Sequence, residues 1–144
     1  MKLLNKDEIL NRLNSTDSIN ISLKYAVNDV ILFGSILTEN FNEESDVDIA
    51  VIGHKKLSLD SLLEMELYYE KLLQRNIDIV DLRSDNLDLF VKINILNDGR
   101  IIYSNDNKKQ FYEIYNYVDN FYKDNENYMY FRRRDLLSWI RKDW

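Results

Sequence analysis

The sequence has no cysteine and no proline, three glycines, and a single histidine, His54. Without cysteine the chain forms no disulfide, thiolate metal site or thiol nucleophile. One histidine leaves no partner for a multi-histidine metal centre. No apolar run approaches 18 residues, so the sequence predicts no membrane span. The N-terminus is amphipathic and acidic, unlike a signal or transit peptide, and we expect a cytoplasmic protein.

What is present is the composition of a globular domain: 144 residues, 45% hydrophobic and 31% charged, with a net charge of −6. Residues 1–107 carry 11 basic and 19 acidic side chains, whereas residues 108–144 carry 8 and 6. This acidic body argues against strong direct binding to nucleic acid. The mildly basic tail is interpreted first as ordinary helix surface, with partner binding as the alternative. Within it, residues 128–134 combine aromatic side chains with three arginines, which we interpret first as an ordinary helix, second as a contact for a partner protein and third as a contact for RNA.

The hydrophobic pattern predicts an α/β (α+β) chain built on one small sheet. Helical periodicity predicts helices over 3–13, 58–73, 87–96, 107–122 and 128–141, with a short helix over 36–41. Apolar runs predict strands over 25–33, 47–52, 77–82 and 100–103, and residues 14–22 read as a polar turn. We therefore expect a core domain over 1–106 and C-terminal helices over 107–144 that pack on the core or on a partner.

A glycine and a serine, Gly34 and Ser35, follow directly on the first predicted strand. Glycine lets the backbone approach a ligand closely, because no Cβ stands in the way. The free N–H groups of a helix start and the serine hydroxyl are suited to a phosphate. The same pair also forms ordinary turns, so these two residues alone do not decide between the two interpretations.

Carboxylates interrupt two of the predicted strands. Asp46 and Asp48 are two residues apart, so they point to the same face of an otherwise apolar strand. A bound divalent cation offsets the cost of holding two such groups together, and hard oxygen ligands favour Mg²⁺. Asp78 lies between two isoleucines of the next strand, while Asp81 faces the opposite side. At most one of these two joins the first pair, and Asp81 also reads as an ordinary strand-end acid.

Together these residues form the pattern Gly34-Ser35, ten residues, Asp46-x-Asp48, and a lone Asp78 about 30 residues later. This pattern resembles the nucleotidyltransferase signature of the DNA polymerase beta superfamily. In size and element order the chain is similar to the minimal nucleotidyltransferases, more narrowly to the MntA-type antitoxins of HEPN/MNT toxin–antitoxin systems. The resemblance covers roughly residues 25–103 and implies a small mixed sheet flanked by helices.

The resemblance also implies a function. Asp46, Asp48 and Asp78 would be the catalytic residues and the ligands of two Mg²⁺ ions, and Gly34, Ser35 and Ser45 would bind the nucleotide. The reaction would transfer AMP from ATP to a tyrosine hydroxyl of a cognate HEPN ribonuclease toxin and so neutralise it. The partners implied are therefore a HEPN-family toxin and a nucleotide.

One departure from the family pattern leaves an alternative open. Members commonly carry arginine and glycine shortly after the Gly-Ser pair, where this chain has Thr38 and Glu39. Lys55, Lys56 or the C-terminal arginines are candidates to replace the missing positive charge. The alternative is a catalytically weak or inactive antitoxin that neutralises its toxin by direct binding. A third option, a small-molecule nucleotidyltransferase, usually needs a larger acceptor-binding domain than this tail offers.

Overall fold

The computed structural model describes residues 4–124. The chain divides into two compact units, residues 1–111 and 112–144, and the account below concerns the first. The helix expected over 128–141 lies outside the described residues, and the division into a core and helices that pack on it or on a partner stays a prediction. The elements are α1 (Lys6–Leu13), α2 (Thr16–Lys24), β1 (Val27–Phe33), the 3₁₀ turn η1 (Gly34–Leu37), β2 (Val47–Gly53), α3 (Leu59–Leu73), β3 (Ile77–Asp81), α4 (Leu89–Asp98), β4 (Arg100–Ser104) and α5 (Lys109–Asp124).

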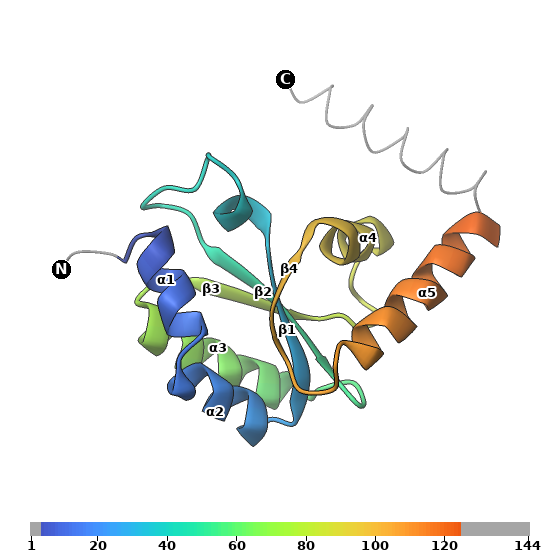
Figure 1. Cartoon of the computed structure of the whole chain (residues 1–144), viewed down its shortest axis with the longest axis horizontal. Coiled ribbons are helices and arrows are strands. Elements are labelled where there is room, and N and C mark those ends of the chain that lie inside the picture. The colour runs from blue at the N-terminus through green and yellow to red at the C-terminus, as the bar shows by residue number, and fades with distance from the viewer. Residues whose placement is uncertain (1–3, 125–144) are drawn as a thin grey trace. The chain divides into compact units, whose positions relative to one another are not determined.

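Four strands form one mixed sheet in the order β3-β2-β1-β4. Strand β1 pairs antiparallel with β2 and with β4, while β2 pairs parallel with β3. The parallel pair is connected through α3, as a parallel pair requires a crossover. Helices α1, α2 and α3 lie together on one side of the sheet and α4 lies on the other (Figure 1). The mixed sheet flanked by helices confirms the expected fold class.

The main core lies between the sheet and helices α1 to α3. Every second residue of β2 faces this core, from Val47 through Ile49 to Val51, and all three are fully buried. Met65 and Tyr69 of α3 cover them from the helix side. Because successive strand residues alternate between faces, Asp48 lies on the opposite face, the side of α4.

Within the segment interpreted as a turn over 14–22, only Asn14 and Ser15 lie between helices, while residues 16–22 belong to α2 (Thr16–Lys24), so that interpretation was wrong for most of the segment. Serine, threonine, aspartate and asparagine have modest helix propensity, which hides the helix in the composition. The hydroxyl of Ser15 accepts from the N–H of Ser18 at 3.4 Å and begins α2 as its N-cap. Ile21 and the small side chains of Ser18 and Ser22 then pack against the core, so tertiary contacts stabilise a helix that propensity alone does not.

Within residues 4–124, no helix combines the length and the apolar character needed to cross a membrane. This agrees with the absence of a long apolar run in the sequence.

Asp29 is a buried acid in β1 whose substitution tests the packing of the sheet. Asp29 is fully buried, and neither of its carboxylate oxygens has a hydrogen-bond partner. Burial is the largest cause that raises the pKa of Asp29 above its ordinary value of 3.8; the nearby Ser104 hydroxyl acts in the opposite direction, and the Asp106 carboxylate raises the pKa further. The folded chain therefore binds this proton more tightly than the unfolded chain. Stability falls as the pH rises past the ordinary value and is lowest above the raised pKa.

We expect Asp29→Asn to stabilise the fold at neutral pH by about 1–3 kcal/mol, because the amide removes an unpartnered buried charge. The gain should vanish near about pH 3, where the carboxyl is neutral in both states. Urea unfolding of both proteins across this pH range measures it. Asp85→Asn, at an exposed acid paired with Lys56 at 2.8 Å, is the control and should give no gain. An Asp29→Asn variant less stable than the native chain at neutral pH would contradict this account.

Candidate active site

The register of the sheet brings Asp48 and Asp78 together. The two residues are direct neighbours across the parallel pair β2 and β3, where strands lie about 4.8 Å apart. They also share the face opposite the main core, because Val47, Ile49 and Ile77 occupy the core side. The structure thus places two of the three expected acids side by side near the beginning of each strand.

Asp46 lies at the end of the loop that leads from η1 into β2, one residue before the strand. Its side chain is exposed, that of Asp48 is half-buried, and that of Asp78 is exposed at the edge strand. The negative charges of Asp46 and Asp78 both raise the pKa of Asp48. The expected trio is therefore electrostatically coupled around Asp48.

Gly34 lies against Asp48. Phe33, the last residue of β1, pairs with Asp48, so the chain turns at Gly34 beside that carboxylate. Gly34 has a φ of +81°, and a Cβ there would overlap Asp48 Oδ2. Both the backbone conformation and the close approach require glycine at this position.

Ser35 and Ser45 flank the acids from two loops. The helix expected over 36–41 is a single 3₁₀ turn over Gly34–Leu37, which ends where Thr38 donates its N–H and its hydroxyl to the carbonyl of Ser35, at 2.9 and 2.8 Å. This short turn therefore offers an anion its backbone N–H groups, but no helix dipole. The hydroxyl oxygen of Ser45 accepts from the N–H of Asn42 at 3.1 Å, so Ser45 shapes its own loop and keeps its hydroxyl proton for donation.

Burial and like charges act together on Asp48. Burial, then the charge of Asp78, then that of Asp46 raise the pKa of Asp48 from 3.8 to about 6. Ionisation of Asp48 therefore lowers the stability of the fold as the pH rises from 3.8 towards about 6. A bound cation would reverse this effect, because it neutralises the repulsion that raises the pKa.

The donor set fits Mg²⁺. In the part of the chain that the structure describes, no group of three or more acidic, histidine or cysteine side chains is placed to hold a metal ion, so Asp46, Asp48 and Asp78 do not form a ready-made three-ligand cage. Magnesium does not require one, because it is usually held by one or two carboxylates and keeps water and substrate phosphate oxygens as its other ligands. The neighbouring carboxylates of Asp48 and Asp78 match that requirement, with Asp46 on the adjoining loop.

Residues 17–108 match the family model of the polymerase beta nucleotidyltransferases, which covers more than half of the chain. The chain belongs to this family. The match includes the Gly34-Ser35 turn and all three acids, and it confirms the resemblance that the sequence pattern indicated.

Two curated relatives come from Methanocaldococcus jannaschii, "Putative protein adenylyltransferase MJ1217" and the protein of the same name numbered MJ0126. The chain is 37% identical to the first and 35% to the second over 57 residues, which is 40% of this chain and 58% of each relative. The chain thus spans a little more than half the length of these curated relatives.

Solved toxin–antitoxin complexes contain chains of the same fold. A chain of a complex with AMP-PNP aligns with a TM-score of 0.62 and 18% identity, over 88% of this chain and 96% of that one. A chain from the complex of a tri-AMPylated Shewanella oneidensis HEPN toxin with an MNT antitoxin aligns with a TM-score of 0.60 and 16% identity, over 87% and 96%. At these identities the likeness establishes the fold of the nucleotidyltransferase.

The structure also shows what occupies the place of the missing arginine. Thr38 closes the 3₁₀ turn, and Glu39 is exposed. Lys6 of α1, which the sequence did not single out, donates its ammonium to the carbonyl of Thr38 at 3.1 Å. Lys55 and Lys56 both follow Gly53, the last residue of β2, whereas Asp48 lies near the beginning of that strand, and Lys56 pairs with Asp85 at 2.8 Å, so both lysines lie away from the acids. The C-terminal arginines lie outside the described residues.

Two other polar residues of the motif region do not join the acids. Asp81 is buried at the end of β3, and its carboxylate accepts from the N–H of Leu57, in the loop before α3, at 2.8 Å and from that of Arg83, in the turn after β3, at 2.9 Å, so it ties these two segments together. His54 is exposed beyond the opposite end of β2, where its Nδ1 lies 2.9 Å from Nε2 of Gln110. The histidine is an exposed loop residue rather than part of this site.

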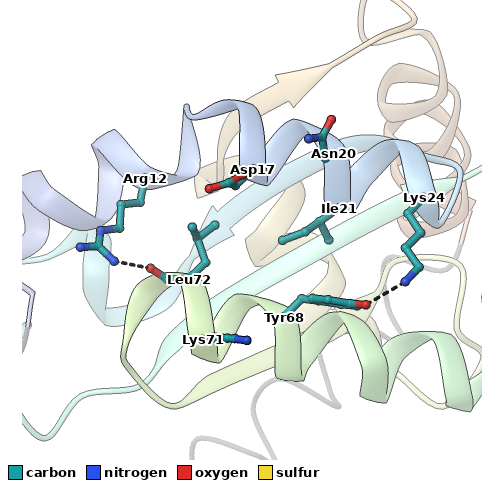
Figure 2. Close-up of a pocket in the computed structure, with 8 residues that line it drawn as sticks. All are labelled: Arg12, Asp17, Asn20, Ile21, Lys24, Tyr68, Lys71 and Leu72. Carbon is teal, nitrogen blue, oxygen red and sulfur yellow. Dashed lines mark hydrogen bonds between the residues drawn. The ribbon is translucent and has the colours of Figure 1, made fainter.

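A separate groove lies between α2 and α3 and has a volume of about 440 Å³. Figure 2 shows its lining, with Ile21 and Leu72 among charged and polar side chains, and with Lys24 hydrogen-bonded to the hydroxyl of Tyr68. Arg12 crosses one end, where it donates to the carbonyl of Leu72 at 2.8 Å. The groove belongs to the helical layer, so the acids on the other face of the sheet do not line it.

We expect Gly34→Ala to remove metal binding at the acids, because the added Cβ would displace the carboxylate of Asp48 and strain a backbone at positive φ. Titration with Mn²⁺ followed by electron paramagnetic resonance measures the loss. Gly53→Ala at the far end of β2, where φ is ordinary and a Cβ would meet the carbonyl of Ala26 at 3.1 Å, is the control. Unchanged Mn²⁺ affinity in a folded Gly34→Ala protein would contradict the placement.

The carboxyl of Asp48 should titrate with a midpoint of about 6 in the metal-free protein. Asp78→Asn should lower that midpoint, because it removes a neighbouring negative charge. Asp85→Asn should leave it unchanged, because that exposed acid pairs with Lys56. Carbon-13 NMR of the carboxyl groups across pH provides the measurement, and a midpoint insensitive to Asp78→Asn would show that the two carboxylates are not neighbours.

Proposed function

We propose that the chain is a Mg²⁺-dependent protein adenylyltransferase that transfers AMP from ATP to a tyrosine of a cognate HEPN ribonuclease toxin and thereby neutralises it as an antitoxin. The single observation that carries the proposal is the coupling of Asp46, Asp48 and Asp78 beside the Gly34 turn. This arrangement occurs in a chain of the nucleotidyltransferase family.

The carboxylates of Asp46, Asp48 and Asp78 would hold the metal. Two Mg²⁺ ions bound there would supply Lewis-acid stabilisation of the entering and leaving oxygens of an in-line displacement. The backbone N–H groups at Gly34 and Ser35 would bind the phosphates, and the Ser45 hydroxyl would donate a further hydrogen bond. The close approach of Gly34 to Asp48 supports this arrangement, because the turn and the acids are neighbours.

The residues of the chain then act on the acceptor. The tyrosine oxygen forms a bond to the α-phosphorus while the bond from that phosphorus to the bridging oxygen breaks, so pyrophosphate leaves. Asp78 is exposed at the edge strand, and its carboxylate accepts the proton of the acceptor hydroxyl. Positioning and charge neutralisation supply most of the rate in this reaction class.

The similar proteins support this proposal without deciding it. The curated relatives carry adenylyltransferase names, and solved complexes of the same fold contain a toxin, an antitoxin, AMP-PNP or an AMPylated HEPN toxin. We therefore propose an acceptor and a nucleotide of these same classes for this chain. A cytoplasmic location belongs to the proposal, because ATP and the RNA targets of such a toxin are found there.

A second candidate is an antitoxin that acts by contact alone. Thr38 and Glu39 in place of arginine and glycine favour it, because they remove a positive phosphate contact and add a negative charge. The coupled acids favour catalysis instead, because three carboxylates around a half-buried position destabilise the fold unless they bind a cation.

Asp48→Asn should reduce transfer of radiolabelled AMP from ATP to the cognate toxin by at least about a hundredfold, the size expected when one electrostatic contact to the transition state is lost. Asp46→Asn and Asp78→Asn should act in the same direction. Asp85→Asn is the control with an equal charge change, and it should transfer label as the native chain does.

The double variant Asp46→Asn and Asp48→Asn separates the two candidates. Under the proposal it no longer rescues cells that express the toxin. If it still rescues them at equal abundance, contact is the mechanism, and if it still transfers label, the assignment of the acids is wrong.

A further inference from the structure

Arg75 is a buried arginine in the segment between α3 and β3. It is 8% exposed, and all three of its hydrogen bonds go to backbone carbonyls: that of Leu4 at 3.2 Å, of Asn42 at 2.5 Å and of Ser45 at 2.6 Å. The guanidinium lies over the ring of Phe41, 4.6 Å from its centroid. Neither ion pair found within residues 4–124 involves it.

A buried charge without a carboxylate partner is costly unless its donors are satisfied. Here one loop, residues 41–45, supplies most of the contacts to the guanidinium, because two of the three carbonyls and the aromatic ring belong to it. Arginine suits this role, because one planar group presents several donors in fixed directions. Its Nη2 alone reaches both loop carbonyls.

Hydrogen bonds from Arg75 and to Asn76 fix the backbone on both sides of Asp46. The carbonyl of Ser45 belongs to the peptide unit that precedes Asp46, and Arg75 holds it. The N–H of Val47 belongs to the peptide unit that follows Asp46, and it donates to the carbonyl of Asn76 at 2.9 Å. Because each peptide unit is a rigid plane, fixing both leaves the backbone of Asp46 little freedom to rotate.

Arg75 and Asn76, which hold the backbone on either side of Asp46, lead directly into β3. Asn76 immediately precedes the strand, and Asp78, its second residue, pairs in register with Asp48. One short stretch of chain therefore fixes the backbone of Asp46 and, two residues later, carries Asp78. This connection holds the third acid at a set place relative to the neighbouring pair.

We infer that Arg75 is a positioning residue of the metal site: its guanidinium holds residues 42–45 so that Asp46 presents its carboxylate beside Asp48 and Asp78 to a divalent cation. The inference rests on the proposed function for the identity of the site. It adds a residue outside the family motif on which the geometry of the motif depends.

The experiment compares Arg75→Lys with Arg12→Met in the full chain, with Mn²⁺ as the probe. Arg12 is the control, because its guanidinium likewise donates to a backbone carbonyl, that of Leu72, but in the helical layer and away from the acids (Figure 2). Arg75→Lys keeps the charge but loses the fork, so we expect Mn²⁺ affinity to fall by about tenfold or more. Arg12→Met should leave that affinity unchanged.

Hydrogen exchange supplies a readout that general destabilisation does not move. In Arg75→Lys the amide of Val47 should exchange faster relative to that of Ile49 in the same strand, because the loop before it is released. In Arg12→Met the ratio of the two exchange rates should stay as in the native chain. Should Arg75→Lys fail to fold, Phe41→Leu removes only the ring beneath the guanidinium and should weaken Mn²⁺ binding by a factor of about two to five.

The outcomes separate the two claims. If the native chain binds Mn²⁺ and both Arg75→Lys and Phe41→Leu bind it equally well, Arg75 has no positioning role, while the proposed function stands. An unchanged exchange ratio in folded Arg75→Lys also overturns the inference. If the native chain binds no Mn²⁺ at the acids, the proposed function fails, and the inference about Arg75 fails with it.

Discussion

The repulsion between carboxylates that the sheet forces together is the constraint on which the rest of the structure depends. Parallel pairing of β2 with β3 places Asp48 and Asp78 side by side, and the apolar core on the other face fixes the register. Sliding either strand by one residue would move apolar side chains out of that core. The folding free energy of the core therefore holds two like charges close together, at a position where a bound cation would relieve their repulsion.

Two segments complete the candidate site around this pair of acids. On one side β1 ends at Gly34, whose missing Cβ lets the turn contact the carboxylate of Asp48. On the other side the chain between α3 and β3 holds the loop that ends at Asp46. The turn and the acids, which we propose bind phosphate and metal, become neighbours because β1 and β2 are antiparallel partners, with Phe33 opposite Asp48.

The sequence predicted the parts of this arrangement that residue type and spacing express. Alternation in β2 and β3 indicated the strands and the face of the acids, and the glycine pointed to a close approach. Helix α2 escaped because its residues have modest propensity and its stability comes from packing. Arg75 and Lys6 escaped because their contacts join segments about 30 residues apart, and no local pattern reports such a distance. The bond that the carboxylate of Asp81 accepts from the N–H of Leu57, 24 residues earlier, is hidden from the sequence for the same reason.

The most direct test of the central claim is a crystal structure of the chain with Mn²⁺ and AMP-PNP, with anomalous scattering to locate the metal. The account predicts anomalous density bonded to the carboxylates of Asp46, Asp48 and Asp78, with phosphates lying over Gly34 and Ser35. Density for Mn²⁺ at other residues, or a nucleotide bound elsewhere on the chain, would contradict it.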